Sequence, residues 1–432
     1  MKILIKNGHI IDTIQNIDGK YDILIEDGQI KEINKDINSS DAEIIKAENK
    51  IIFPGLIDMH VHLREPGYED KETIKTGAEA AAAGGFTKIA CMPNTKPAVD
   101  NPASVEYIKS KAKKAVVNVL PIGSITKNRE GKELAELGFL ARAGVKAVSD
   151  DGNPVMNSEI MRRAMEYADN FGLTIISHCE DLNLAGEGVM NEGYYSTILG
   201  LKPIPAAAEE TMIARDIMLA EFTNSSLHIA HLSTKRGMEL VAEAKERGLK
   251  ISAEVTPHHF SLTDEAVKGY DPNTKVNPPL RSKEDLEALK NGIAEGIIDV
   301  IATDHAPHTY EDKLGEFDYA ANGISGLETA LSLVNTNLIK ENIINYKDLV
   351  KLMYEKPIEI LGIDKKGIKK GELADLIVFD PEKEWRVDIN KFKSKGKNTP
   401  FVGQKLKGKN MITICNGKIV YDDRGDKGEI IY

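Results

Sequence analysis

The feature that most constrains the fold of this chain is a regular alternation of short apolar segments and longer amphipathic stretches through its middle. The stretches Lys71–Ala83 and Ser158–Asn170 have helical periodicity, and Gly84-Gly85 and Gly172 follow them as helix stops. The apolar segments have the length of strands, and they are Leu56–His62, Thr87–Met92, Val117–Ile122, Val145–Ser149, Thr174–His178, Leu227–His231, Ile251–Val255 and Asp299–Asp304. Eight strand-helix units predict an α/β chain with a closed (β/α)8 TIM-like barrel. An open doubly wound sheet is less suitable, because no glycine-rich dinucleotide motif accompanies the strands.

The two ends of the chain share a different pattern, in which an Asn-Gly or Asp-Gly pair is followed by β-branched residues. This pattern occurs at Lys6–Ile10, Glu26–Ile30 and Cys415–Ile419. Such pairs favour the two-residue turns of β-hairpins. We therefore expect one small β-sandwich domain built from both termini. Residues 1–52 and 366–432 would form it, and residues 53–365 would form the barrel.

The composition excludes several classes of protein. A hydrophobic content of 41% and a charged content of 28% are typical of a globular enzyme and not of a disordered or fibrous chain. The net charge of -11, with no block of basic residues, argues against a nucleic-acid partner. Three cysteines without a pairing pattern fit a reducing cytoplasm. We see no signal peptide and no apolar run of membrane-spanning length, so we expect no membrane association.

The stretch Asp58–Gly67 contains two histidines, His60 and His62, at the end of an apolar run. Residues two apart on a strand project from the same face. Two imidazoles in this arrangement can bind one metal ion, and such an ion can generate a hydrolytic nucleophile at neutral pH. An isolated His-x-His pair is a weak signal that more often marks two hydrogen-bonded core histidines, so the metal interpretation depends on the rest of the sequence.

Further metal-capable side chains fall at the ends of later predicted strands. They are Asp150, Asp151, His178, His231 and Asp304. The carboxyl ends of barrel strands share one face, so these side chains should lie together with His60 and His62. Burying so many ionisable groups without compensation would be costly, and a metal site is therefore the preferred interpretation. Nitrogen and oxygen ligands without thiolates suit zinc, and their number suits two ions that share a carboxylate.

A second set of polar residues lies just past the strand ends and could bind an anionic or amide-containing ligand. It comprises Arg64, Asn94, Asn277 and His308. Arginine supplies a planar fork of donors that matches a carboxylate. The other histidines have simpler interpretations. His228 should point to the far side of its strand and pack against a helix, and His305 could orient Asp304.

Four segments together resemble a known family. They are Pro54–Gly67, Met92–Thr95, Val276–Arg281 and Ala302–His308, and they are similar to the signature of the dihydroorotases, which are cyclic amidohydrolases. The resemblance extends over essentially the whole chain. It implies the reversible interconversion of L-dihydroorotate and N-carbamoyl-L-aspartate in de novo pyrimidine biosynthesis. It also implies a cytoplasmic homodimer and an association with aspartate carbamoyltransferase.

The resemblance assigns roles by position. One zinc ion would be held by His60, His62 and Asp304, a second by His178 and His231, and Asp151 would bridge the two. The substrate carboxylate would be bound by Arg64, Asn94 and His308, with His62 also near the substrate. The ring would contact Asn277 and the main chain of Asn322 and Gly323. Asp304 would also act as general base and acid.

Two alternatives remain open from the sequence. A carbamylated Lys146, on the fourth predicted strand, could bridge the metals in place of Asp151. The activity could be that of an allantoinase or a dihydropyrimidinase, whose substrates lack the ring carboxylate, and Arg64 argues against both. A non-catalytic partner of aspartate carbamoyltransferase should have lost metal ligands, and here every expected ligand is present.

Overall fold

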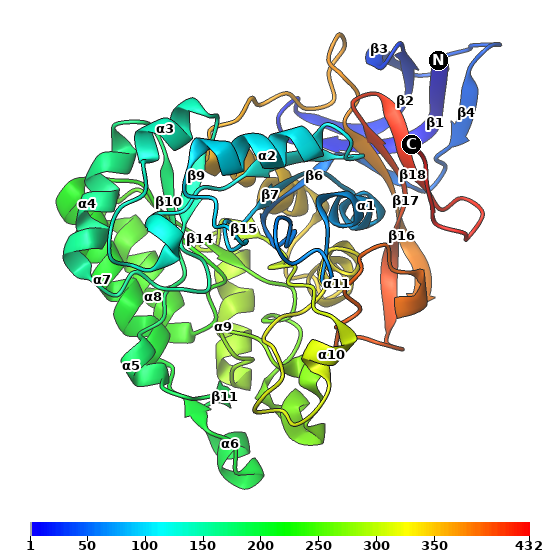
Figure 1. Ribbon diagram of the computed structural model, residues 1–432. Helices are drawn as coiled ribbons and strands as arrows, with labels where there is room; N and C mark the ends of the chain where they lie inside the picture. Colours follow the sequence, from blue (N-terminus) through cyan, green and yellow to red (C-terminus); the bar gives the residue numbers. More distant parts are fainter. Residues whose placement is uncertain (1) are drawn as a thin grey trace.

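A computed structural model describes residues 2–432 and contains a closed barrel of eight parallel strands (Figure 1). The strands are β6 (Leu56–Val61), β7 (Phe86–Cys91), β8 (Asn118–Pro121), β9 (Ala147–Ser149), β10 (Thr174–Ser177), β13 (Leu227–Ile229), β14 (Ile251–Val255) and β15 (Val300–Ile301). They pair in the orders β6-β7-β8 and β9-β10-β13-β14-β15. Parallel bridges between Gly123 and Val148 and between Val61 and His305 join the two sets into a ring. The predicted barrel is confirmed.

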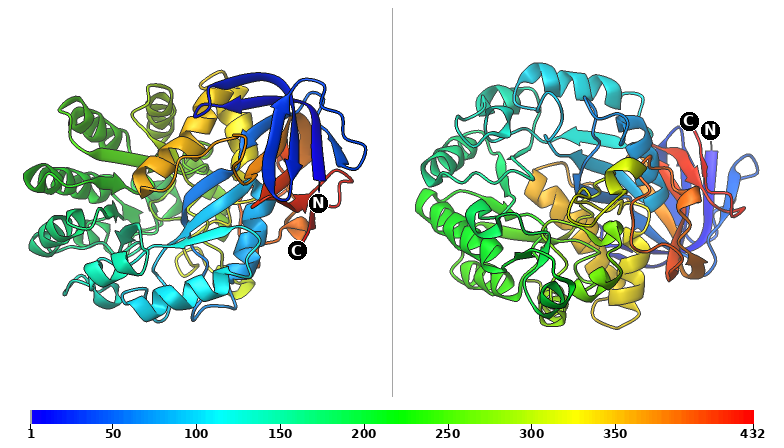
Figure 2. Two further views of the ribbon diagram at one scale, coloured as in Figure 1. Left: turned by 90° about the horizontal axis from the view of Figure 1, so that it is seen from above. Right: turned by 60° about the horizontal axis from the view of Figure 1, so that its bottom comes forward.

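Helices surround the strands, as the right-hand view of Figure 2 shows. Their bounds are α1 (Ile74–Gly84), α2 (Pro102–Ala112), α3 (Leu137–Arg142), α4 (Ser158–Asp169), α5 (Leu182–Ala185), α6 (Tyr194–Leu199), α7 (Ala207–Thr223), α8 (Lys235–Glu246), α9 (Lys283–Ala294), α10 (Tyr310–Lys313), α11 (Ala330–Val334), α12 (Tyr346–Val350) and α13 (Lys356–Leu361). The π-helical segments Asn335–Ile339 and Lys351–Glu355 continue α11 and α12, and the short strands β11 (Met190–Asn191) and β12 (Pro203–Ile204) flank α6.

The start of α1 differs from the prediction by three residues. The sequence pattern placed it at Lys71, but the side chain of Thr73 accepts a hydrogen bond from the main chain of Thr76 and caps the helix there. The helix ends as expected, because Gly85 adopts a left-handed conformation with φ of 91°.

Several barrel strands end earlier than predicted, and the reason bears on the site. β13 ends at Ile229, and His231, which was expected to close it, has φ of 33°. β15 ends at Ile301, and Asp304 has φ of 46°. In both cases the backbone leaves the extended conformation, so the alternation of side chains between the two faces of a strand no longer applies.

Strands from both ends of the chain form a second, nine-stranded sheet beside the barrel (Figure 2). They are β1 (Lys2–Asp12), β2 (Ile17–Glu26), β3 (Gln29–Asn34), β4 (Glu43–Lys46), β5 (Ile51–Pro54), β16 (Leu376–Arg386), β17 (Lys405–Cys415), β18 (Lys418–Asp422) and β19 (Glu429–Ile430). Their order is β19-β18-β17-β16-β5-β1-β2-β3, and β4 pairs with β1. Ile30 of β3 and Ile419 of β18 share one hydrophobic core although their strands are far apart in this order. The sheet therefore folds over a common core, which agrees with the expected sandwich.

Two of the three predicted hairpin turns are confirmed. Asp27-Gly28 joins β2 to β3 and Asn416-Gly417 joins β17 to β18, with positive φ at all four residues. The expectation for Asn7-Gly8 was wrong, because this pair lies inside β1 and makes a bulge in its pairing with β2. The carboxylate of Asp22 accepts the main-chain N–H of Asn7 at 2.7 Å and supports the bulge.

The sheet and the barrel are joined directly. Gly55 alone separates β5 of the sheet from β6 of the barrel, and its missing side chain leaves room for Thr87. Within the described residues, no helix is long and apolar enough to cross a membrane. The division of the chain after residues 52 and 365 stays a proposal, and β5 extends across the first of these boundaries.

Candidate active site

The carboxyl ends of the barrel strands surround a cavity of about 240 Å³. Its lining includes most of the residues that the sequence singled out, namely His62, Arg64, Asn94, Asp151, His178, His231, Asn277, Asp304, His308, Asn322 and Gly323. A larger cavity of about 520 Å³ lies between the barrel and the terminal sheet, and none of the clustered histidines lines it. We therefore place the active site in the smaller cavity, since the chemistry is concentrated there.

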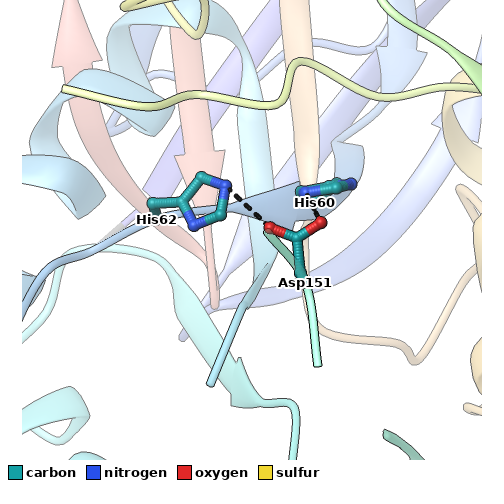
Figure 3. Close-up of side chains that lie close together, drawn as sticks. All are labelled: His60, His62 and Asp151. Atoms are coloured by element: carbon teal, nitrogen blue, oxygen red, sulfur yellow. Dashed lines mark ion pairs between the residues drawn. The ribbon is translucent and has the colours of Figure 1, made fainter. Parts of the chain in front are cut away.

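Asp151 lies just beyond β9, and Figure 3 shows its carboxylate between the rings of His60 and His62. Its Oδ1 atom is 3.3 Å from Nε2 of His60, and its Oδ2 atom is 3.5 Å from Nε2 of His62. On its other side, Oδ1 is 3.8 Å from Nδ1 of His178 and 3.5 Å from Nε2 of His231. One carboxylate thus faces four imidazoles that come from β6 and from the ends of β10 and β13.

These residues form two overlapping groups that are suited to metal binding. The first is His60, His62 and Asp151, the second is Asp151, His178 and His231, and in each the potential ligand atoms lie within 4.8 Å of one another. Asp151 belongs to both groups. All five side chains are buried. Two ions that share one carboxylate would fit this arrangement.

Several polar atoms of the cluster have no hydrogen-bond partner within the described residues. They include His60 Nε2, Asp151 Oδ1 and His231 Nδ1. A buried polar atom without a partner costs free energy, so such atoms call for an explanation. A cation held between His60 Nε2 and Asp151 Oδ1 would satisfy both atoms, and the residues present therefore fit a metal site.

Asp304 lies next to the first group but is not part of it. Its Oδ1 atom is 2.8 Å from His62 Nε2 and 3.4 Å from His60 Nε2. Burial alone would raise the pKa of this carboxyl, but the two rings outweigh burial and lower the pKa below its usual value. Asp304 is therefore ionised at neutral pH and can accept a proton.

One wall of the cavity carries a cation, Arg64, that has no ion pair within the described residues. Arg64 donates from Nε to the carbonyl of Pro307 at 3.2 Å and has Nη2 3.3 Å from Nε2 of His308. It forms no ion pair with any residue between 2 and 432, and it lines the cavity. Burial, and then the charge of Arg64, lower the pKa of His308 to about 3, so this ring is neutral. The wall is thus positively charged, and an anionic group would complete it.

Comparisons with known proteins agree with this geometry. A family model described as dihydro-orotase-like matches residues 49–237. A dihydroorotase from Caldanaerobacter subterraneus subsp. tengcongensis is 56% identical over 98% of this chain and 97% of its own length. One from Thermoanaerobacter sp. is 55% identical over the full length of both chains. The chain belongs to the dihydroorotase family.

Solved structures show the same fold in related enzymes. The L-hydantoinase (dihydropyrimidinase) from Arthrobacter aurescens is 26% identical, covers all of this chain and 97% of its own, and superposes with a TM-score of 0.85. A D-hydantoinase at 24% identity superposes with a TM-score of 0.86 over all of this chain and 98% of its own, and this likeness concerns the fold alone. The resemblance inferred from the sequence motifs is confirmed, and the chain is a dihydroorotase-family member with the barrel-and-sandwich fold.

The structure separates the two candidates for the bridging group in this dihydroorotase-family chain. Lys146 precedes β9 and is exposed, and it lines a different cavity together with Lys88 and Asn118. Asp151 follows β9 at the opposite end of the strand. The placement therefore favours Asp151 over a carbamylated Lys146. Asp150 was also a candidate ligand, but its carboxylate turns away and accepts the main-chain N–H groups of Ile125 and Thr126.

The sequence analysis missed two carboxylates that contact the rings of the clustered histidines. Glu254, near the end of β14, lies 2.5 Å from His60 Nδ1, and Glu180 lies 3.2 Å from His178 Nε2. Glu180 also accepts both hydrogen bonds from the amide of Asn277, at 3.2 and 3.1 Å. The only sequence signal for Glu180 was its position two residues after His178. A glutamate inside an apolar strand was the only signal for Glu254.

The expectation for His228 was wrong. It was expected to face a helix, but Nδ1 lies 2.8 Å from Ser252 Oγ and Nε2 lies 3.1 Å from the carboxylate of Glu254. The side chain therefore points along the same face as Glu254. The break in β13 before His231 allows both His228 and His231 to lie on the inner side of the barrel.

Proposed function

We propose that this chain catalyses the reversible hydrolysis of L-dihydroorotate to N-carbamoyl-L-aspartate, a step of de novo pyrimidine biosynthesis. Its membership of the dihydroorotase family supports this proposal. The observation that carries it is the position of Arg64, an unpaired guanidinium in the same cavity as the histidine and aspartate cluster. A cyclic amide with a carboxylate on its ring would place the carboxylate at Arg64 and the amide bond at the histidine and aspartate cluster.

The substrate carboxylate would be bound by Arg64, Asn94 and His308. The Oδ1 atom of Asn94 is 2.8 Å from His62 Nδ1, which leaves its amide N–H groups available to a ligand. His308 Nε2 lies 2.9 Å from the carbonyl of Asn322, which connects this ring to the next segment of the wall. A planar guanidinium fork and an amide donor would together fix both the position and the plane of a carboxylate.

The ring of the substrate would contact His62, Asn277 and the main chain of Asn322 and Gly323. All four line the cavity. Glu180 holds the amide nitrogen of Asn277, so the amide oxygen of Asn277 is left to accept a ring N–H. This arrangement would orient the amide bond toward the cluster.

Two zinc ions would occupy the cluster. His60, His62 and Asp304 would hold one, His178 and His231 would hold the other, and Asp151 would bridge them. The nitrogen and oxygen donors support zinc, and the shared position of Asp151 supports two ions. Bound divalent ions would supply an activated water and polarise the amide carbonyl.

Asp304 would move the proton. Its carboxylate is ionised at neutral pH and lies 2.8 Å from His62, at the wall nearest the ring. In hydrolysis it would accept a proton from the attacking water and pass it to the leaving ring nitrogen. In ring closure the same carboxyl would act in its protonated form, by microscopic reversibility.

A comparison of substrates tests the assignment of function. The metal-replete protein is assayed with dihydroorotate, carbamoyl aspartate, dihydrouracil and allantoin, and its metal content is measured by elemental analysis. We expect turnover of the first two and about two zinc ions per chain. Turnover of dihydrouracil or allantoin at the higher rate would instead favour a dihydropyrimidinase or an allantoinase. Absence of all four activities in zinc-loaded protein would favour a non-catalytic partner of aspartate carbamoyltransferase.

The chain would act as a cytoplasmic homodimer that can associate with aspartate carbamoyltransferase. Three buried, unpaired cysteines support a reducing compartment. The side chains of Met218 and Phe222 on α7 are 69% and 71% exposed, which supports a protein contact at this surface. Light scattering of the purified chain, alone and mixed with the transcarbamoylase, tests both associations.

A further inference from the structure

Glu254 is a fully buried carboxylate beside the cluster. It lies in β14, with neighbours on β13 and β15, and none of its surface is exposed. A buried carboxylate is costly unless charged or hydrogen-bonding groups compensate it. The groups that compensate Glu254 therefore indicate its role.

All three of its polar contacts lead toward the candidate metal ligands or to a supporting histidine. Oε1 lies 2.5 Å from His60 Nδ1 and accepts the main-chain N–H of His231 at 3.2 Å. Oε2 lies 3.1 Å from His228 Nε2. The remaining nitrogen of His228 is 2.8 Å from Ser252 Oγ, so this histidine is itself fixed from both sides.

The contact with His60 determines which ring nitrogen is free. A carboxylate accepts hydrogen bonds, so Nδ1 of His60 carries a proton and donates it to Glu254. Nε2 then faces Asp151 at 3.3 Å and is one of the buried atoms without a hydrogen-bond partner. A carboxylate at the far nitrogen also increases the basicity of the nitrogen that binds a metal.

The contact with His231 acts on the main chain. His231 has φ of 33°, a conformation that is rare and strained for a residue with a side chain. The hydrogen bond from its N–H to Glu254 holds the chain in this conformation, and the ring of His231 then points at Asp151.

We propose that Glu254 is a positioning residue, which fixes the ring of His60 and the main chain of His231 so that both imidazoles are directed at Asp151. Glu254 thus orients His60 of the first metal-binding group and His231 of the second. This inference rests on the proposed metal site and adds to it a residue that touches neither metal nor substrate.

The test measures zinc affinity rather than turnover. The dissociation constant for zinc is determined by competition with a chromophoric chelator for the wild-type chain, Glu254→Gln and Glu254→Ala. Loss of such an outer partner typically weakens metal binding about 10- to 100-fold. We expect a loss in this range for Glu254→Ala and a smaller loss for Glu254→Gln, which keeps the shape and an acceptor oxygen but removes the charge.

Glu209→Gln is the matched control. Glu209 is also buried and is paired with Arg281 at 3.1 Å, and it contacts none of the clustered histidines. We expect this variant to lose thermal stability and to keep the wild-type zinc affinity. An equal loss of affinity in Glu209→Gln would overturn the proposal, because the effect would then follow from any missing buried carboxylate.

A second readout reports the ring directly. In zinc-loaded protein labelled with nitrogen-15, we expect the Nδ1 proton of the wild-type His60 ring to have the strongly downfield shift of a proton hydrogen-bonded to a carboxylate, and Glu254→Ala to lose that shift. Glu254→Gln decides the outcome if Glu254→Ala does not fold. Wild-type zinc affinity in Glu254→Gln, together with an unchanged shift of the His60 Nδ1 proton, would overturn this inference and leave the proposed metal site standing. Failure of the wild-type chain to bind zinc would instead overturn the proposed metal site.

Discussion

Replacing Arg64 by lysine tests the proposed carboxylate contact most sharply. The structure uses Nε of Arg64 for the carbonyl of Pro307 and places Nη2 beside His308, which leaves the outer edge of the guanidinium facing the cavity. That edge can donate two parallel hydrogen bonds to a carboxylate. Lysine keeps the charge but has a single nitrogen, so it cannot contact Pro307 and both carboxylate oxygens at once.

The expected magnitude follows from losing one of these bonds. A hydrogen bond to a charged group contributes about 1.5–3 kcal/mol. Because each factor of ten in affinity corresponds to about 1.4 kcal/mol, dihydroorotate should bind Arg64→Lys roughly 10- to 150-fold more weakly. Arg64→Met, which also removes the charge, should lose more.

The assay compares dihydroorotate with the analogue that carries a carboxamide in place of the carboxylate. Inhibition constants of the analogue and KM values for dihydroorotate are measured in the wild-type chain and in Arg64→Lys. We expect a large loss for the carboxylate and a small one for the carboxamide. Arg215→Lys is the control, since Arg215 pairs with Asp216 away from the cavity. Equal losses for both ligands would refute the reasoning, because Arg64 would then support the wall without contacting the carboxylate.

Three further predictions concern the proton, a half-buried acid, and residues 309–321, which join the cavity-lining residues His308 and Asn322. Asp304→Asn should lower kcat about 100-fold or more, with zinc content checked by elemental analysis. Near-normal turnover in a variant that keeps its zinc would show that the proton acceptor is another group. Burial raises the pKa of Glu328 to about 7, against the opposing N–H groups of Lys393 and Ser394, so the folded chain holds this proton longer than the unfolded chain. The free energy of unfolding should therefore fall as pH rises from about 4.5 to about 7, and Glu328→Gln should flatten that dependence in urea titrations; an unchanged slope would contradict the shift. Lys313 donates to the carbonyls of Pro272 and Ala321 at 3.0 and 2.6 Å. Lys313→Met should therefore speed hydrogen exchange in residues 309–321 and raise KM. Exchange rates equal to those of the wild-type chain would show that another contact anchors this segment.

Much of the fold and the site was predictable because the strands of a (β/α)8 barrel are parallel, so their carboxyl ends all lie at one face. Apolar segments of strand length, interrupted by helices, predicted the barrel, and this geometry predicted that residues at the carboxyl ends would meet. His60, His178 and His231 lie in different segments of the sequence, and the structure brings them around the carboxylate of Asp151. The prediction succeeded because it required only the direction of each strand and the position of its end.

The errors arose where one residue changes the backbone direction. His228 was misplaced because the alternation rule was extended through His231, whose positive φ ends it. Asn7-Gly8 was expected to be a turn because the dipeptide favours positive φ, and a bulge uses the same conformation within a strand. Glu254 could not be assigned a role from the sequence, since its partners His60 and His228 lie on other strands of the barrel, and the sequence alone does not bring them together.

The direct joint between β5 and β6 has a consequence for the order of events during synthesis. β5 pairs with β16, and the main-chain N–H of Gly55 is bonded to the carbonyl of Asp375. The strand that carries His60 and His62 is therefore anchored at its start by a segment that the ribosome makes only after the entire barrel. Until β16 emerges, β5 has an unpaired edge, and such an edge is prone to pair with other chains. Nascent chains of this protein should thus need protection from aggregation until late in translation.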